Sequence, residues 1–365
     1  MSDPNNPAGD TPQPSAEDLQ QVEKLQKSYE GSQFVFGGLG AQGGAETGLG
    51  TIFAFQILPT IVFVSSLFSI LYYLGVMQVI VRGLAWVMVR TMGTSGAESL
   101  AVGASIFMGQ TEAPLTIRPF LAKLTESELF LVMVAGMASV SGAILGAYVD
   151  IGRVPIEHLL TAVAMTAPIS VVMAKLVVPE SDTPQTAGKV DVEIPKTDAN
   201  LLDAASSGAG EGMKLALNVG AMLIAFIALV ALANAFLEVF VIGGEPLTLE
   251  RIFGWLFMPL ALLMGVPWEE AFDVGTVLGT RTVVNELVAF DTLRGVAGSL
   301  SERSHSIATF AVTGFANVSS IGILIGGLGG LVPERKHDIA RLGIRALFAA
   351  TLANFSSACV AGALL

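Results

Sequence analysis

SLAVGASIFMGQTEAPLTIRPFLAKL, residues 99–124, is a mainly apolar segment that is broken in its middle by polar residues. One apolar run ends at Gly109, the polar cluster Gln110-Thr111-Glu112 follows, and Pro114 opens a second short run. A helix needs roughly 20 apolar residues to cross a bilayer, so each run reaches only part of the way. Irregular backbone at membrane depth is tolerated only where it lines protein or a water-filled cavity. The segment therefore predicts a re-entrant hairpin with its polar tip near the membrane midplane.

A second segment of the same kind lies in the other half of the chain. AFDVGTVLGTRTVVNELVAFDTL, residues 271–293, places Asn285-Glu286 between two half-length arms. The stretches after the two hairpins also correspond, ASVSGAILG at 138–146 with ANVSSIGIL at 316–324. Paired interrupted helices in two halves of a chain indicate an inverted-repeat transporter with its substrate site at the repeat interface. We therefore expect an all-α polytopic membrane protein with two re-entrant helical hairpins and interrupted transmembrane helices.

Composition supports this class and excludes others. The chain is 52% hydrophobic and 14% charged, with a mean hydropathy of +0.67, which is outside the range of an ordinary soluble domain. The net charge of −12 leaves no basic surface for nucleic acid. A single cysteine, Cys359, excludes an internal disulfide and a cysteine metal cluster. Strand-type alternation is absent, which disfavours a barrel.

Hydropathy divides the chain into spans and connecting segments. The runs expected to cross the membrane are 51–81, 129–149, 159–174, 215–237, 306–333 and 346–365, with a shorter apolar run at 252–267 and an interfacial helix at 83–93. The first half is expected to contain a polar N-terminal arm with an interfacial segment near 22–29 (1–50), a scaffold segment with the first span and the interfacial helix (51–96), and a first repeat with the first hairpin and the spans that follow it (97–178). A polar linker (179–212) separates it from the second half. The second half is expected to contain a scaffold span with a short apolar segment (213–267), a second repeat with the second hairpin and an interrupted span (268–333), and a cytoplasmic loop with the last span (334–365). The basic residues at 335, 336, 341 and 345 place that loop in the cytoplasm.

Glu112 and Glu286 are the main candidates for ligand binding. An ionised carboxylate at the bilayer centre costs at least about 2.5–3.5 kcal/mol, so function is the first explanation, with capping of a neighbouring half-helix as the alternative. The neutral donors and acceptors nearby favour a polar uncharged substrate over an anion; they are Gln110, Thr111, Asn285, Asn317 and Ser320. Phe315 could supply an apolar or stacking face, or could simply pack.

Energy and chemistry are constrained by what the sequence lacks. The glycines at 326–330 are not followed by the Lys-Ser or Lys-Thr of a phosphate-binding loop, so uphill transport would need an ion gradient. The sequence contains no HExxH and no GxSxG, which makes an intramembrane enzyme a remote alternative. The residues thus predict a transporter rather than an enzyme.

GQTEAPL (109–115), VVNELVAF (283–290) and GFANVSSIGI (314–323) closely resemble the concentrative nucleoside transporters. The resemblance extends from QFVFG at 33–37 to Leu365. It implies a bacterial nucleoside:cation symporter of the cell inner (plasma) membrane, without cofactors, that forms a homotrimer. A scaffold would hold the trimer, and both hairpins would belong to a mobile transport domain.

The resemblance also implies residue roles. By this resemblance the nucleobase contacts would be Gln110, Thr111 and Glu112, with Ile144 at the apolar position and Phe315 lining the base. The ribose contacts would be Glu286, Asn317 and Ser320. Pyrimidine and purine nucleosides both stay open as substrates.

The coupling ion stays open between sodium and proton. The family's sodium site corresponds to Ser105, Met108, Ser139 and Val140, but the sodium-coupled members carry Asn where Ser105 stands. A proton carried by Glu112 or Glu286 is the alternative. Bacterial members also usually have two spans before the QFVFG-like segment, where this sequence has a polar arm. A short form, a trimmed gene model and a non-transporting nucleoside binder are the alternatives this leaves.

Overall fold

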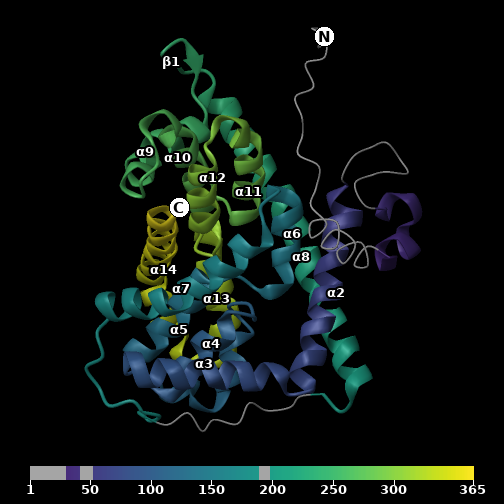
Figure 1. The fold of residues 1–365 in the computed structure, drawn as a ribbon, viewed down its shortest axis with the longest axis vertical. Coiled ribbons are helices and arrows are strands. Elements are labelled where there is room, and N and C mark those ends of the chain that lie inside the picture. Colours follow the sequence, from purple (N-terminus) through teal and green to yellow (C-terminus); the bar gives the residue numbers. More distant parts are fainter. Residues whose placement is uncertain (1–29, 42–51, 189–197) are drawn as a thin grey trace, which may run out of the picture.

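The computed structural model describes residues 30–41, 52–188 and 198–365, and it is almost entirely helical (Figure 1). Its first half contains η1 (Gly37–Gly40), α2 (Phe53–Tyr73), α3 (Val76–Met92), α4 (Gly96–Ser105), η3 (Ala113–Lys123), α5 (Glu126–Ala138), α6 (Gly142–Gly152) and α7 (Ile156–Val177). Its second half contains α8 (Leu201–Leu237), β1 (Val241–Ile242), β2 (Glu245–Pro246), α9 (Leu249–Leu263), α10 (Trp268–Val283), α11 (Glu286–Val296), η4 (Ala297–Ser299), α12 (Glu302–Val312), α13 (Val318–Leu331), η5 (Pro333–Arg335) and α14 (Lys336–Leu364). The interfacial segment expected near 22–29 lies outside the described residues.

Several of these helices have the length and apolar composition of membrane spans. Within the described ranges there are five, namely α2, α5 with α6, α7, α8, and η5 with α14, or six if the bent pair α9 and α10 counts as one span. The bend in that pair is 117°, and Gly265 in the joining turn has φ +91°, a conformation that favours glycine. The interfacial helix expected at 83–93 is the second half of α3, which begins earlier, at Val76.

Both expected hairpins are present. In the first, α4 and the short helical turns of η3 pack against each other, and residues 106–112 form the tip. In the second, α10 and α11 pack together around a tip at Val284 and Asn285. The Asn285 side chain ends the break by capping α11, because it accepts a hydrogen bond from Val288 N at 2.9 Å.

The two expected spans that follow the hairpins are interrupted. The run 129–149 is split between α5 and α6 by an extended turn at 139–141, and the run 306–333 is split between α12 and α13 at 313–317. An interrupted span was expected in the second repeat, and Asn317 marks the end of the break by capping α13, where its side chain accepts a hydrogen bond from Ser320 N at 3.0 Å. One backbone group freed at each break is paired with the other break, because Phe315 N donates to Ser139 O at 3.1 Å.

The polar linker expected at 179–212 ends earlier than predicted. Helix α8 begins at Leu201, where the Asn200 side chain accepts hydrogen bonds from Leu202 N and Asp203 N. Its first turns are polar by composition but present a buried stripe of small residues to α2, which includes Gly208 and Gly212. Close packing of small residues between helices therefore extends the helix beyond its hydrophobic run.

The basic loop expected before the last span is also helical. Helix α14 starts at Lys336 and contains Arg341 and Arg345. Arg341 pairs with Glu126 at 2.6 Å, and Arg345 donates to Val177 O at 3.0 Å, at the C-terminal end of α7. These two arginines thus lie in a helix, α14, rather than in a loop, and they contact the ends of the neighbouring helices α5 and α7.

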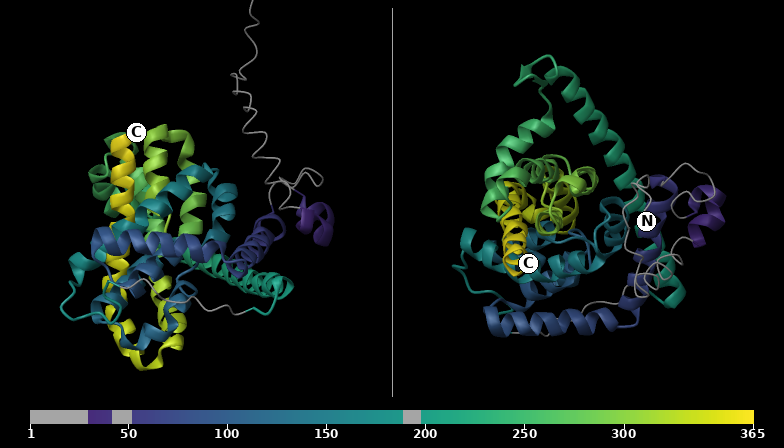
Figure 2. Two further views of the ribbon diagram at one scale, coloured as in Figure 1. Left: turned by 60° about the horizontal axis from the view of Figure 1, so that its bottom comes forward. Right: turned by 45° about the horizontal axis from the view of Figure 1, so that its top comes forward.

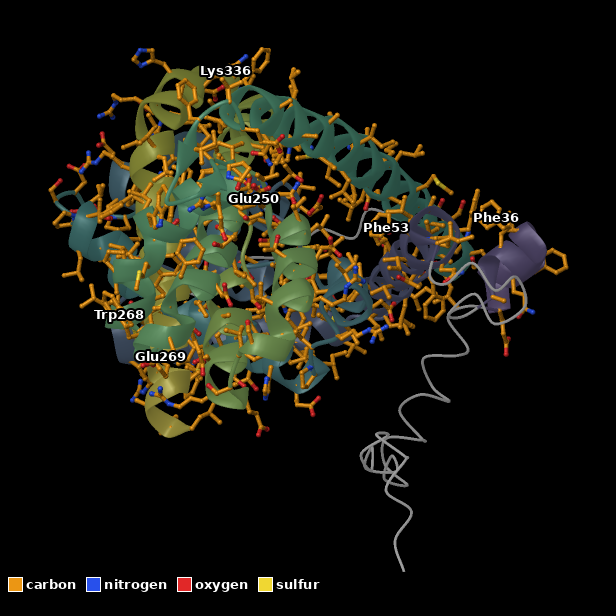
Figure 3. All side chains as sticks on the ribbon, turned by 90° about the horizontal axis from the view of Figure 1, so that it is seen from above. Phe36, Phe53, Glu250, Trp268, Glu269 and Lys336 are labelled. Atoms are coloured by element: carbon orange, nitrogen blue, oxygen red, sulfur yellow. The ribbon has the colours of Figure 1, made fainter. Side chains whose placement is uncertain are left out.

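The elements form a central bundle flanked by an outlying pair of helices. Figure 1 shows the interrupted helices, α7 and α14 gathered in the bundle, with α2 and α8 at one side and α3 lying across the lower edge. In Figure 2 (right), α8 slants away from the bundle to the β1–β2 hairpin, and α9 leads back. Figure 3 shows Phe36 and Phe53 on the outlying part, far from Trp268. Only part of α8 therefore faces the bundle.

Candidate functional site

A cavity of about 790 Å³ lies where the two hairpin tips, the second interrupted helix and α8 meet. Its lining includes the following predicted site residues: Gln110, Thr111, Glu112, Asn285, Glu286, Phe315, Asn317 and Ser320. The first three come from the tip of the first hairpin, the next two from the second, and the rest from the break before α13 and its first turn. Residues up to 210 positions apart in sequence thus line one space of the size typical of small-molecule sites.

Glu286 is the best-held acceptor in this cavity. Its side chain is buried, and Asn317 Nδ2 donates to its Oε2 at 2.9 Å while Tyr148 Oη donates to its Oε1 at 3.1 Å. Glu286 is also the first residue of α11, whose N-terminal amides favour a negative charge. Capping and ligand binding are therefore compatible for this carboxylate, because each oxygen retains a further lone pair.

The tip of the first hairpin presents a second polar group. Thr111 Oγ1 donates to Glu112 Oε1 at 2.8 Å. The other oxygen of Glu112 lies close to where a Cβ at Gly109 would be, so a side chain at position 109 would require this carboxylate to move. Gln110 is 5% exposed, and its Oε1 has no hydrogen-bond partner within the described part of the chain. A buried acceptor that lines a cavity without a partner is one that a ligand donor can satisfy.

The residues of the expected sodium site lie near each other behind the first hairpin tip. Ser139 Oγ donates to Ser105 O at 2.6 Å, and Val140 is buried in the break between α5 and α6. Ser105 Oγ is turned to its own helix and donates to Val102 O at 2.8 Å. Hydroxyl and carbonyl oxygens are the ligands that a hard cation takes, so this donor set suits sodium without the side chain of residue 105. Met108 lies within the tip of the first hairpin. Its side chain is half-buried and lines a small adjoining cavity.

Ile144 stands apart from the other predicted residues. It is 1% exposed in an apolar cluster with Tyr148 and Phe290, and it is absent from the cavity lining. Its contact with a nucleobase stays a prediction.

Four further residues at the site were missed by sequence reasoning. Tyr148 holds Glu286 from α6, where it stacks on Phe290 with ring centroids 4.6 Å apart. Glu211, Lys214 and Asn218 line the cavity from α8. Their spacing of three and four residues marks one helical face, but the sequence reading placed Glu211 in a linker.

The chain is similar to two described protein families and to several curated proteins. Residues 158–362 match the family described as Na+ dependent nucleoside transporter C-terminus, and residues 54–154 match the family described as nucleoside recognition. An uncharacterized transporter of Haemophilus influenzae is 47% identical, over 91% of this chain and 81% of its own length. The nucleoside permease NupC of Helicobacter pylori is 41% identical, over 92% of this chain and 81% of its own.

A solved structure has the same fold. CNTnw in an inward-facing substrate-bound state is 43% identical and superposes with a TM-score of 0.86, covering 94% of this chain and 84% of that one.

Proposed function

This chain belongs to the concentrative nucleoside transporter family, and from that membership we propose that it imports nucleosides such as uridine by symport with a cation. As a family member it is a transporter rather than an enzyme and a multi-pass protein of the plasma membrane. The substrate, the ion and the residue roles below are our proposal.

The observation that carries the proposal is the convergence of Glu112 and Glu286 on one cavity. Gln110, Thr111 and Glu112 would bind the nucleobase, with Phe315 against its face. Glu286, Asn317 and Ser320 would bind the ribose hydroxyls. Carboxylates accept hydrogen bonds and cannot donate when ionised, so they suit the hydroxyl and amide donors of a nucleoside.

The charge of the cavity favours nucleosides over nucleotides. Of the described residues that line it, Glu112, Glu211 and Glu286 contribute carboxylates and Lys214 contributes the single ammonium. A phosphate would meet a net negative surface and would therefore be repelled.

Sodium is the ion we propose. The description of the matching family and the name of a 40% identical rat relative, sodium/nucleoside cotransporter 2, both support it, although this chain covers only 53% of that relative. In this chain the oxygens of Ser105 and Ser139 would bind the ion. The alternative to sodium symport is proton symport, in which Glu112 or Glu286 would carry the proton.

The test is uptake of radiolabelled uridine by purified protein in proteoliposomes under an inward sodium gradient, an inward proton gradient, or neither. Accumulation of uridine driven by the sodium gradient supports the proposal. Accumulation driven by the proton gradient alone would instead mean that a proton, carried by Glu112 or Glu286, is the coupling ion. Binding of uridine without accumulation under either gradient would refute transport and favour a nucleoside binder. Crosslinking in liposomes would test the homotrimer, which we expect from the family.

A further inference from the structure

Asn354 of α14 lies inside the central bundle, between the two interrupted helices. Its side chain is 0% exposed. Its Nδ2 group donates to Ala138 O at 2.7 Å and to Thr313 O at 3.0 Å. Ala138 ends α5 and Thr313 directly follows the end of α12, so one amide bridges the carbonyls at the points where the two half-helices give way to the breaks.

Arg281 fixes the orientation of this amide. Its guanidinium, also 0% exposed, donates through Nη2 to Asn354 Oδ1 and through Nη1 to Thr351 Oγ1 at 3.3 Å. Arginine has only donors, so the oxygen of Asn354 must face it and the NH₂ group must face the two carbonyls. The amide therefore uses both of its donors on the two breaks and cannot rotate without losing all of these bonds.

The two breaks also touch directly. Phe315 N donates to Ser139 O at 3.1 Å, which joins the backbone of one break to that of the other. Gly314 makes room for the contact, since a Cβ there would lie 2.7 Å from Ala138 O. Residues 139–140 belong to the proposed cation site and residues 315–320 to the proposed nucleoside site, so the two sites share one hydrogen-bonded layer.

Among the described residues, α14 carries this amide link and α7 has no counterpart of it. Helix α7 follows the first interrupted helix as α14 follows the second, but its sequence contains neither Asn nor Gln. Because α7 packs beside the first interrupted helix without an amide side chain, the packing of α14 beside the second does not by itself explain Asn354.

We propose that Asn354, oriented by Arg281, is the positioning residue that couples the cation site at the first break to the nucleoside site at the second. A cation that draws the carbonyls of residues 139–140 toward itself changes the position of the Ala138 peptide, and the amide transmits this change to Thr313. This inference rests on the proposed sodium–nucleoside symport. It assigns Asn354 no contact with either ligand.

The test measures coupling rather than activity. Uridine Kd is determined by equilibrium binding to purified full-length protein, without sodium and at saturating sodium, and the ratio of the two values is the coupling factor. Coupling factors of about 5–150 are typical of linked sites. Asn354→Asp keeps the shape and the partner for Arg281 but removes both donors, so we expect its coupling factor to fall to about 2 or less while uridine still binds.

Two further variants complete the test. Ser357→Ala is the matched control, because Ser357 is buried one turn further along α14 and its hydroxyl has no hydrogen-bond partner within the described residues. Its coupling factor should equal that of the wild type. Arg281→Met serves if Asn354→Asp does not fold; by freeing the amide to rotate, it should lower the coupling factor at least about threefold.

The outcomes separate the inference from the proposed function. If the wild type and Ser357→Ala are coupled and folded Asn354→Asp or Arg281→Met keeps the full coupling factor, the inference is wrong and the symport proposal stands. If wild-type uridine affinity does not depend on sodium, the proposed sodium symport is wrong and the inference falls with it. Loss of coupling in the variants, with uridine binding retained, supports both.

Discussion

Asn317 donates a hydrogen bond from its side-chain amide to Glu286 Oε2 at 2.9 Å, although 31 positions separate them in sequence. One residue caps α13 after the second break, and the other begins α11 after the second hairpin tip. Because each also lines the cavity, this bond fixes the relative position of two elements that would bind one ligand. The site is thus held together by residues that also form it.

Glu286→Gln should strongly reduce uptake. The replacement amide would place a donor against Asn317 Nδ2 or Tyr148 Oη, and would weaken the acceptor offered to a ribose hydroxyl. Hydrogen bonds to charged groups are worth about 1.5–3 kcal/mol, so kcat/KM for uridine should fall roughly 10- to 100-fold. Glu269→Gln, an exposed position on the same hairpin (Figure 3), is the control and should transport normally. Normal uptake by folded Glu286→Gln would remove this residue from the site.

Tyr148→Phe should lower kcat/KM for uridine less than Glu286→Gln does. It removes the 3.1 Å hydrogen bond to Glu286 Oε1 but keeps the ring stacked on Phe290 and the Asn317 bond to the other oxygen. We expect kcat/KM for uridine to fall about tenfold or less, as for the loss of one hydrogen bond of about 1.5 kcal/mol or less. The same uptake assay checks this. An unchanged kcat/KM would mean that the tyrosine does not position the carboxylate during transport.

That Glu112 and Glu286 line a cavity could be predicted from sequence, because a carboxylate in an apolar run is costly and therefore stands out. Tyr148 could not, since a tyrosine in an apolar helix is ordinary and only the fold brings it to Glu286. The start of α8 was missed for a different reason. Its first turns are held by contact between small residues and α2, which hydropathy does not register.

Ser139→Ala should raise the sodium concentration needed for half-maximal uptake by about tenfold, the equivalent of about 1.4 kcal/mol. The variant removes the hydroxyl that lies 2.6 Å from Ser105 O in the proposed cation site. Sodium titration of uridine uptake, at fixed membrane potential, measures the change. Ser170→Ala is the control, because within the described residues that buried hydroxyl donates to Ala167 O in its own helix and has no other partner. Equal sodium dependence in Ser139→Ala and the wild type would place the ion elsewhere.

Uridine 5′-monophosphate should compete poorly with uridine. At an effective dielectric constant of about 20, two unit charges about 8 Å apart repel by about 2 kcal/mol, so an excess of carboxylates should weaken the nucleotide roughly 30-fold. Competition for labelled uridine uptake gives the ratio of inhibition constants. Glu211→Gln removes one of the three lining carboxylates and should narrow that ratio, while Lys214→Met should widen it. A ratio near one in the wild type would contradict the exclusion of phosphates by charge.

Glycine-to-alanine variants on α8 should separate packing from helix propensity. At Gly212 a Cβ would lie 2.8 Å from Val62 Cα and from Ser65 Cβ on α2, so the helices would have to move apart. At Gly210, two residues away on the same helix, it would meet no atom within 4 Å. Alanine favours a helix over glycine by roughly 1 kcal/mol, whereas overpacking costs about 1–3 kcal/mol. Thermal unfolding of the purified protein should therefore show a lower Tm for Gly212→Ala and an equal or higher Tm for Gly210→Ala. Equal Tm values for the two variants would show that the α2–α8 contact adds nothing to stability, and that the polar first turns of α8 are held by other means.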